Sequence, residues 1–175
     1  ENKGGMDMYG YFASHFFNDA MFQWTENLAS RIEAETGLEL YVPQRNDGIN
    51  NKKDNDATIT AEAISKADTL ELKKSNILIA CLDGLTIDDG VSGEVMAHGI
   101  MAEFEKDQGI DFPRMQIGII TDMRMQGTGD NRLDRNQMII GKIKEHGHMV
   151  IGYPMDQAYI EEVINLIKDF MADHS

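Results

Sequence analysis

Four acidic side chains gather around one glycine-rich turn of the sequence: Asp83, Asp88, Asp89 and Glu94. They follow Ile77–Leu82, a continuous apolar run that is typical of a strand buried on both faces. Carboxyl groups that lie close together raise one another's pKa, so one can stay protonated and donate a proton. An ionised partner can then attack an electrophilic carbon. A sugar transferred with retention needs both roles, because one carboxylate carries the sugar covalently between two steps.

Glu94 is the candidate nucleophile of this group. We predict a helix over Val91–Lys106, which places Glu94 in its opening turn, where the helix dipole favours an ionised carboxylate. Gly90 and Gly93 leave room for a ligand against the backbone. The alternative is that Glu94 is an ordinary acidic residue at the start of a surface helix. For Asp89, a solvated loop position is the favoured interpretation.

The histidines and the remaining acidic stretches do not form a complete set of metal ligands. His98 lies four residues after Glu94 on the same predicted helical face, but no third ligand is evident. The stretch Asp130–Asn136 lacks the glycine and terminal glutamate of a calcium-binding loop. We therefore expect neither a metal nor an organic cofactor.

The elements that position these residues alternate between strand and helix. The sequence predicts five parallel strands with helices on both faces, in a flavodoxin-like (doubly wound) α/β order. One predicted helix precedes the third strand and should bury one stripe of side chains: Ile59, Ala63, Ile64, Ala67 and Leu70. The polar segment 44–55 is predicted to be a loop. The five strands are predicted at Met8–Ala13, Leu38–Val42, Ile77–Leu82, Met115–Thr121 and His148–Gly152.

Length and composition indicate one ordinary globular domain over residues 1–175, with Glu1–Gly5 as a tag remnant or frayed end. The net charge of −14 disfavours a nucleic-acid partner. Apolar runs are too short to cross a membrane. The single cysteine, Cys81, cannot form an internal disulfide, which favours the cytoplasm. A small substrate without strong negative charge is expected.

The segment Asp88–Glu94 reads Asp-x-Gly-x-x-x-Glu directly after a buried strand. This pattern is the central match to the nucleoside 2-deoxyribosyltransferase family, which the sequence resembles. Further matches follow in order across about residues 8 to 140. They are Tyr11-Phe12-Ala13 with Phe16-Phe17, Tyr41-Val42-Pro43 with 44–47, Asp68, and Asn136-Gln137-Met138.

The resemblance implies an enzyme of nucleotide salvage that moves 2-deoxyribose from one nucleobase to another. Glu94 would attack the anomeric carbon, oriented by Tyr11. Asp88 and Asp68 would hold the base, and Asp88 would exchange its proton. Asn136 and Met138 would reach the site from a neighbouring subunit, so a homo-oligomer (a dimer or larger) with shared sites is expected. The remaining residues that we assign to substrate binding are Asp47, Phe16, Phe17 and Gly90.

Two other functions remain open. A related branch hydrolyses deoxynucleoside monophosphates, but that activity needs a phosphate cradle at the first loop. Here the loop reads His15-Phe16-Phe17, which is bulky and apolar and argues against phosphate. An N-glycosidase that hydrolyses deoxynucleosides or deoxynucleoside monophosphates stays the alternative. The other alternative, from a different class, is a nucleotide-sensing module without catalysis on the same fold.

Overall fold

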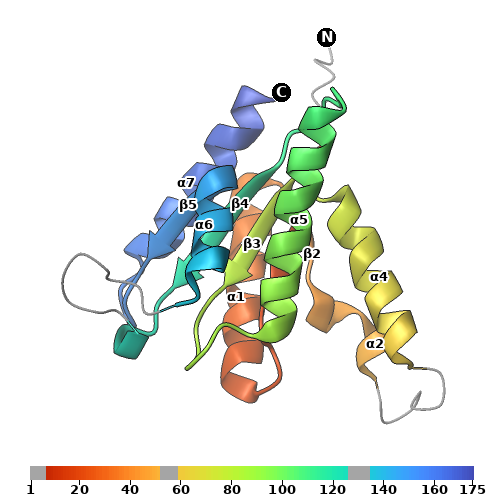
Figure 1. Cartoon of the computed structure of the whole chain (residues 1–175). Coiled ribbons are helices and arrows are strands. Elements are labelled where there is room, and N and C mark those ends of the chain that lie inside the picture. Colours follow the sequence, from red (N-terminus) through yellow and green to blue (C-terminus); the bar gives the residue numbers. More distant parts are fainter. Residues whose placement is uncertain (1–6, 52–58, 126–134) are drawn as a thin grey trace.

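A five-stranded parallel sheet forms the centre of the molecule, with strand order β2-β1-β3-β4-β5 (Figure 1). The structure is a computed structural model that describes residues 7–51, 59–125 and 135–175. The strands are β1 (Tyr9–Ala13), β2 (Glu39–Tyr41), β3 (Ile77–Cys81), β4 (Met115–Ile120) and β5 (Gly147–Ile151). The predicted doubly wound α/β fold is confirmed, and each strand lies within two residues of its predicted bounds.

Helices cover both faces of the sheet. The helices α1 (Asp19–Thr36) and α7 (Ala158–Asp173) pack on one face, and α4 (Ala61–Lys74), α5 (Asp89–Asp107) and α6 (Gln137–His146) lie side by side on the other (Figure 1). Side chains alternate between the faces along each strand. Within β3, Ile77 and Ile79 therefore join the core under α1 and α7, whereas Leu78 and Ala80 join the core under α4, α5 and α6.

Polar side chains cap most of these helices and set where they begin. Asn18 caps α1, Thr60 caps α4, Asp88 caps α5 and Asn136 caps α6, each by accepting backbone N–H bonds of the first turn. Because Asp88 accepts from Val91 N at 3.1 Å, α5 begins at Asp89, two residues before its predicted start. This shift moves Glu94 out of the first helical turn.

The helix α4 does not bury the predicted stripe. Only Leu72 is fully buried there, and Leu70 is 49% exposed. The reason is that α4 lies near the β2 edge of the sheet against α5 and β1, and its inner face carries the acidic residues Asp68 and Glu71. The segment 44–55 was predicted to be a loop, but its described part includes a 3-10 turn η1 (Pro43–Arg45) and a short helix α2 (Asp47–Asn50).

No helix in the described ranges is long and apolar enough to span a membrane.

Candidate active site

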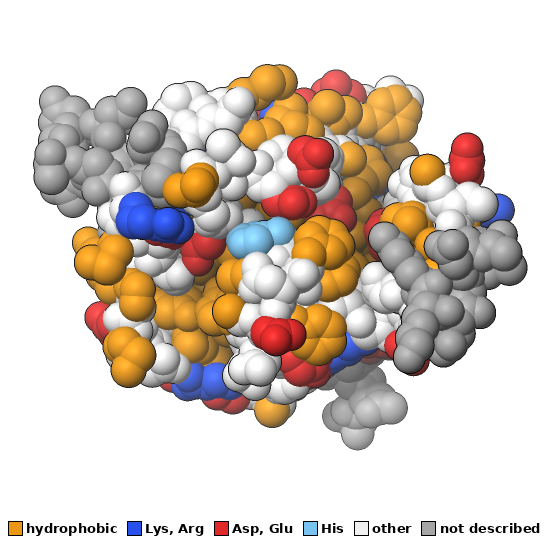
Figure 2. All heavy atoms as spheres, turned by 90° about the horizontal axis from the view of Figure 1, so that it is seen from below, with side chains coloured by type: hydrophobic (Ala, Val, Ile, Leu, Met, Phe, Trp, Pro, Cys, Tyr) orange, Lys and Arg blue, Asp and Glu red, His pale blue; other side chains and the backbone are white. Residues whose placement is uncertain are grey.

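A cavity of about 590 Å³ opens at the carboxyl ends of the strands. It lies beside the junction of β1 and β3, where the chain's winding direction reverses and where open α/β sheets bind ligands. Figure 2 looks onto this end of the molecule and shows acidic side chains among hydrophobic ones. Among the described residues, no Lys, Arg or His lines the cavity. The lining residues are Ser14, Phe16, Phe17, Phe22, Pro43, Ile49, Asn50, Ile64, Asp68, Asp88, Gly90, Val91 and Glu94.

Glu94 is held at this cavity by Tyr11. Tyr11 lies in the middle of β1 and is fully buried, and its Oη donates a hydrogen bond of 2.6 Å to Glu94 Oε1. Burial, followed by the negative charge of Glu94, raises the pKa of Tyr11 far above the neutral range, so the hydroxyl keeps its proton. The tyrosine is therefore a permanent donor that fixes one oxygen of Glu94 and leaves the other to face a ligand.

The charge state of Glu94 differs from the one expected at a helix start. Glu94 is the sixth residue of α5, and the effect of the helix dipole falls off within the first turn. Burial raises the pKa of Glu94 to about 7, and the nearby carboxylates of Asp68 and Asp88 add to that rise. The hydrogen bond from Tyr11 opposes it. Glu94 therefore ionises less readily than an ordinary glutamate, and it lies beyond the first helical turn in which the sequence placed it.

This raised pKa predicts a measurable effect on stability. The unfolded chain has the ordinary value near 4.5, so Glu94 stabilises the fold at pH below 4.5 and loses that contribution as pH rises through 7. Glu94→Gln cannot ionise, and its side-chain oxygen can still accept from Tyr11. We expect equal free energies of unfolding near pH 4.5 and a variant more stable by roughly 2–3 kcal/mol at pH 8.5.

Urea unfolding of parent and variant at the two pH values tests this difference. Asp89→Asn serves as the matched control, because Asp89 is an exposed carboxylate on the same helix. A Glu94→Gln advantage that is the same at both pH values would mean that Glu94 is ionised normally.

Asp88 and Asp89 are adjacent in sequence but differ in position. Asp88 lines the cavity while its Oδ2 caps α5. Gly90 permits this arrangement, because a Cβ atom there would lie 3.1 Å from Asp88 Oδ2. Asp89 is exposed, does not line the cavity and accepts only from the N–H of Gly90, at 2.9 Å. The geometry therefore places Asp88, and not Asp89, beside a ligand.

Asp68, which lies on α4, is the third carboxyl group that lines the cavity. Tyr41 Oη donates to Asp68 Oδ1 at 3.0 Å and accepts from Asn46 Nδ2 at the same distance. Burial raises the pKa of Asp68, and the hydrogen bond from Tyr41 opposes the rise. No role was predicted for Tyr41 or Asn46 from the sequence. The available signal was the place of Tyr41 at the end of β2, in register with Tyr11 of β1.

The first loop contributes two aromatic side chains to the cavity. The rings of Phe16 and Phe17 are 4.7 Å apart and both line the cavity, although Phe17 is 77% exposed. Phe22 of α1 also lines it and was not foreseen.

Three predicted binding residues lie outside the cavity of their own chain. Asp47 is exposed at the start of α2 and does not line it. Asn136 and Met138, at the start of α6, are exposed as well, and Asn136 Oδ1 accepts from Met138 N at 3.0 Å as a helix cap. Asn136 and Met138 therefore do not line the cavity of their own chain.

Asp83, which the sequence places in the acidic group, has a structural role instead. Its Oδ1 accepts from the backbone N–H groups of Thr121 (2.6 Å) and Asp122 (3.0 Å), and its Oδ2 accepts from the Thr121 hydroxyl. Arg135 braces the same loop by donating to the carbonyls of Leu82 and Gly84. These bonds fix the loop that leads to Asp88.

His98 is part of the core. Its Nε2 bonds the carbonyl of Ser75 at 3.1 Å, and its Nδ1 lies 3.3 Å from Gln116 Nε2. Burial, the charge of Arg114 and that of His146 together lower the pKa of His98 to about 3. With both ring nitrogens engaged, His98 has no lone pair left for a metal that would be shared with Glu94.

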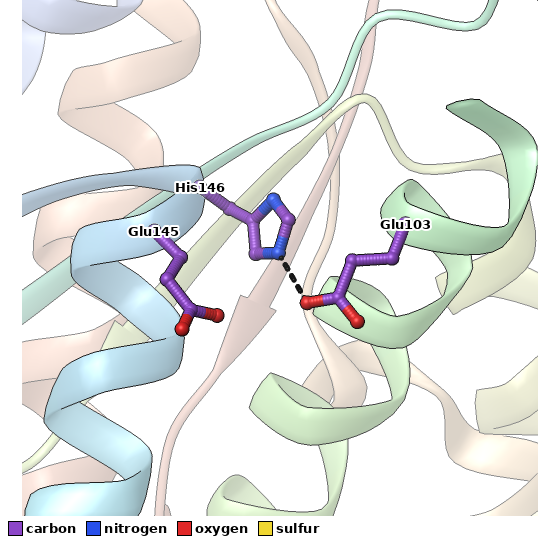
Figure 3. Close-up of side chains that lie close together, drawn as sticks. All are labelled: Glu103, Glu145 and His146. Atoms are coloured by element: carbon purple, nitrogen blue, oxygen red, sulfur yellow. Dashed lines mark hydrogen bonds and ion pairs between the residues drawn. The ribbon is translucent and has the colours of Figure 1, made fainter. Parts of the chain in front are cut away.

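A group of potential metal ligands lies between α5 and α6, away from the cavity. Figure 3 shows Glu103, Glu145 and His146 close together, with Glu103 Oε1 accepting from His146 Nε2 at 3.0 Å. Lys142 forms ion pairs with both glutamates, at 2.8 Å to Glu145. Since this ammonium group already pairs with both carboxylates, the cluster is an ion-pair network that joins the two helices.

Comparison with known proteins identifies the family. The model of the nucleoside 2-deoxyribosyltransferase family matches residues 11–171, so the chain belongs to that family. A conserved protein from Enterococcus faecalis V583 is similar in structure, with a TM-score of 0.68, 28% identity, and coverage of 93% of this chain and 98% of that one. A 2-desoxiribosyltransferase from Leishmania mexicana has a TM-score of 0.52 at 12% identity, over 90% and 97% of the two chains, and shares the fold. No curated protein matches the chain.

Proposed function

We propose that this protein transfers 2-deoxyribose between nucleobases through a covalent ester on Glu94. The observation that carries the proposal is the pairing of Glu94 with Tyr11 in a cavity that also contains Asp88 and Asp68. A nucleophile, a proton donor beside it and a group for the base are the parts that two-step sugar transfer needs.

The proposed reaction has two balanced halves. The ionised Glu94 oxygen forms a bond to C1′ of the sugar as the bond from C1′ to the base nitrogen breaks, and the electron pair of that bond stays on the base. The departing base takes a proton from Asp88, which is left as a carboxylate. A second base then attacks C1′, gives its proton to Asp88 and releases Glu94. Two inversions at C1′ give overall retention.

The cavity favours neutral nucleosides over their monophosphates. Its described lining has three carboxylates and no cationic side chain, and the first loop contributes Phe16 and Phe17. The charged side chains in the described lining are all acidic, and no cationic donor is there to balance a phosphate. This argues against hydrolysis of monophosphates and leaves hydrolysis of deoxynucleosides as the closest competing activity.

One mixture separates the candidate functions. The protein is incubated with a deoxynucleoside and a different free base, and the products are resolved by chromatography. A new deoxynucleoside supports transfer. Free 2-deoxyribose without a new nucleoside would replace transfer by hydrolysis, and unchanged substrates with measurable binding would favour a sensor.

The adjacent aspartates give a paired prediction. Asp88→Asn should lower transfer by about 100-fold or more, because an amide cannot supply the proton. Asparagine caps helices as well as aspartate does, so the start of α5 should be preserved. Asp89→Asn makes the same chemical change one residue away and should change the rate by less than about threefold. Initial rates with one donor and acceptor pair measure both, and the reverse ranking would exclude Asp88 as the proton donor.

We also propose that Asn136 and Met138 serve the site of a neighbouring subunit, as the resemblance implied. Both are exposed in the single chain, and the cap uses only Oδ1 of Asn136. The amide Nδ2 is then the group that would bind the sugar of a substrate held by the other chain. The small-molecule substrates and the homo-oligomer follow from the same proposal.

A further inference from the structure

We propose that Tyr41 is a positioning residue, which holds the Asp68 carboxyl group oriented toward the nucleobase. The inference rests on the proposed function, because it gives Tyr41 a task in base recognition. It starts from a chain of two hydrogen bonds, from Asn46 Nδ2 to Tyr41 Oη and from Tyr41 Oη to Asp68 Oδ1, each 3.0 Å long.

The position of Tyr41 is set by the sheet. It is the last residue of β2, and its Cα pairs with that of Tyr11 on the neighbouring strand. The two rings pack with centroids 5.3 Å apart and planes tilted by 44°. One tyrosine therefore reaches Glu94 on α5, and its neighbour reaches Asp68 on α4. The same pair of strands positions both the sugar end and the base end of the cavity.

The direction of the hydrogen bonds is fixed by chemistry. Burial is the main cause that raises the pKa of Tyr41 to about 12, so its hydroxyl is protonated at neutral pH. An amide NH₂ group can only donate, so Asn46 occupies a lone pair of the hydroxyl and the tyrosine proton goes to Asp68. Asp68 Oδ1 thus already accepts a hydrogen bond from Tyr41, and Oδ2 is the oxygen that can accept from an N–H group of a base.

Asn46 connects this chain of hydrogen bonds to α2, which also contributes to the cavity. Its Oδ1 caps α2 by accepting from Gly48 N at 3.2 Å, while its Nδ2 bonds Tyr41. The residues of α2 that line the cavity are Ile49 and Asn50. A single side chain thus connects the placement of α2 to that of Asp68.

The electrostatic surroundings make this hydrogen bond important. Burial raises the pKa of Asp68, and the bond from Tyr41 is what opposes it. Among the described residues, the other carboxyl groups that line the same cavity are those of Glu94 and Asp88 on α5, and Glu71 lies on α4 three residues after Asp68. Tyr9 and Lys74 both engage Glu71, at 2.6 Å and 2.8 Å. With no cation in the described lining, removal of the Tyr41 hydroxyl should raise the pKa of Asp68 further.

The chain contains a matched control for the test. Tyr9 on β1 donates to Glu71 Oε2 at 2.6 Å, so it forms a second tyrosine–carboxylate pair with α4, three residues after Asp68. Neither Tyr9 nor Glu71 lines the cavity. Tyr9→Phe and Tyr41→Phe delete the same atom from two tyrosine–carboxylate pairs, but only the second pair includes a residue that lines the cavity, Asp68.

The first measurement is independent of activity. The pKa of the Asp68 carboxyl is followed by carbon-13 NMR, with its signal assigned by its absence in Asp68→Ala. We expect Tyr41→Phe to raise that pKa and Tyr9→Phe to leave it unchanged. An unchanged pKa in Tyr41→Phe would overturn the inference whether or not the protein is a transferase.

The second measurement is the kinetics of transfer with varied acceptor base. Tyr41→Phe should raise the KM for the acceptor about tenfold with a smaller change in kcat, since a hydrogen bond to a charged group acts in base binding. In an Asp68→Ala background, Tyr41→Phe should have no further effect. Equal effects with and without Asp68 would give Tyr41 a merely structural role. A parent protein without transfer activity refutes the proposed function instead, and the NMR result then decides on Tyr41.

Discussion

Glu94→Ala and Glu94→Gln should both lower base exchange by about four powers of ten or more, because the covalent path through the Glu94 ester is lost. Glutamine is the more informative change. It retains the shape of glutamate and an oxygen for Tyr11, whose Oη lies 2.6 Å from the carboxylate. Alanine leaves that buried hydroxyl without its partner, which costs about 1–3 kcal/mol of stability.

A measurement of stability separates loss of the nucleophile from loss of folding. Glu94→Gln should unfold at a higher urea concentration than the parent at pH 8.5, while its transfer rate falls to background. A trapped sugar gives a second check, since mass spectrometry of the parent after reaction with a slow donor should show a deoxyribosyl adduct on the peptide that contains Glu94. A folded Glu94→Gln variant that exchanges bases within tenfold of the parent rate would rule out Glu94 as the nucleophile.

The pH profile of the parent should follow the ionisation of Glu94. Since the pKa of this group is raised to about 7, the attacking form becomes more abundant as pH rises through neutrality. Burial in a cavity thus has two effects. It destabilises the fold at high pH, and it produces a carboxylate that is poorly solvated and therefore reactive toward an electrophilic carbon.

The fold was largely predictable from sequence because its signals are local and repeated. Apolar runs such as Ile77–Leu82 mark strands buried on both faces, and alternation with helices implies parallel pairing. The exact helix starts were less accessible. We predicted that the helix after the third strand begins at Val91, and only the structure shows that Asp88 caps α5, which begins at Asp89.

The contents of the site were predictable where the motif is contiguous. Asp88, Gly90 and Glu94 come from one turn of chain, and the structure places all three at the cavity. The same local reasoning was wrong for Asp83, because its partners Thr121 and Asp122 lie on another strand end. Proximity in sequence grouped four carboxylates, whereas the fold separates them by the direction in which each side chain points.

Contacts between distant segments were not accessible in this way. The bond from Tyr41 to Asp68 joins residues that are 27 apart in sequence and was not predicted. The bond from Tyr11 to Glu94 joins residues 83 apart, and that pairing was expected only from the family resemblance. The prediction for α4 was wrong for a related reason. A helical stripe of apolar residues was expected to mark its buried face, but α4 uses that face partly for Asp68 and Glu71, which serve tyrosines of β1 and β2.

The role of Asn136 leads to the second large prediction, which concerns a mixture of inactive variants. If Asn136 completes the site of a neighbouring chain, Glu94→Ala and Asn136→Ala place their lesions on different chains of each shared site. After mixing one to one with reversible dissociation, hybrid dimers contain one site with both lesions and one site with neither. Random pairing makes about half of the dimers hybrids, so roughly a quarter of the parent activity should return.

The helix cap requires its own control, because Asn136 Oδ1 accepts from Met138 N and Ile139 N at the start of α6. Asn136→Ala removes this cap, which costs about 1 kcal/mol, whereas Asn136→Ser retains one. Asn136→Ser should be as inactive as the alanine variant and should complement Glu94→Ala equally well, since serine lacks the amide that binds the sugar. Each variant carried alone through the same dissociation step sets the background. Hybrids that form, as shown by differently tagged chains, but regain no activity would place Asn136 outside a shared site. Because the cavity of its own chain does not include it, Asn136 would then be left with the cap as its function.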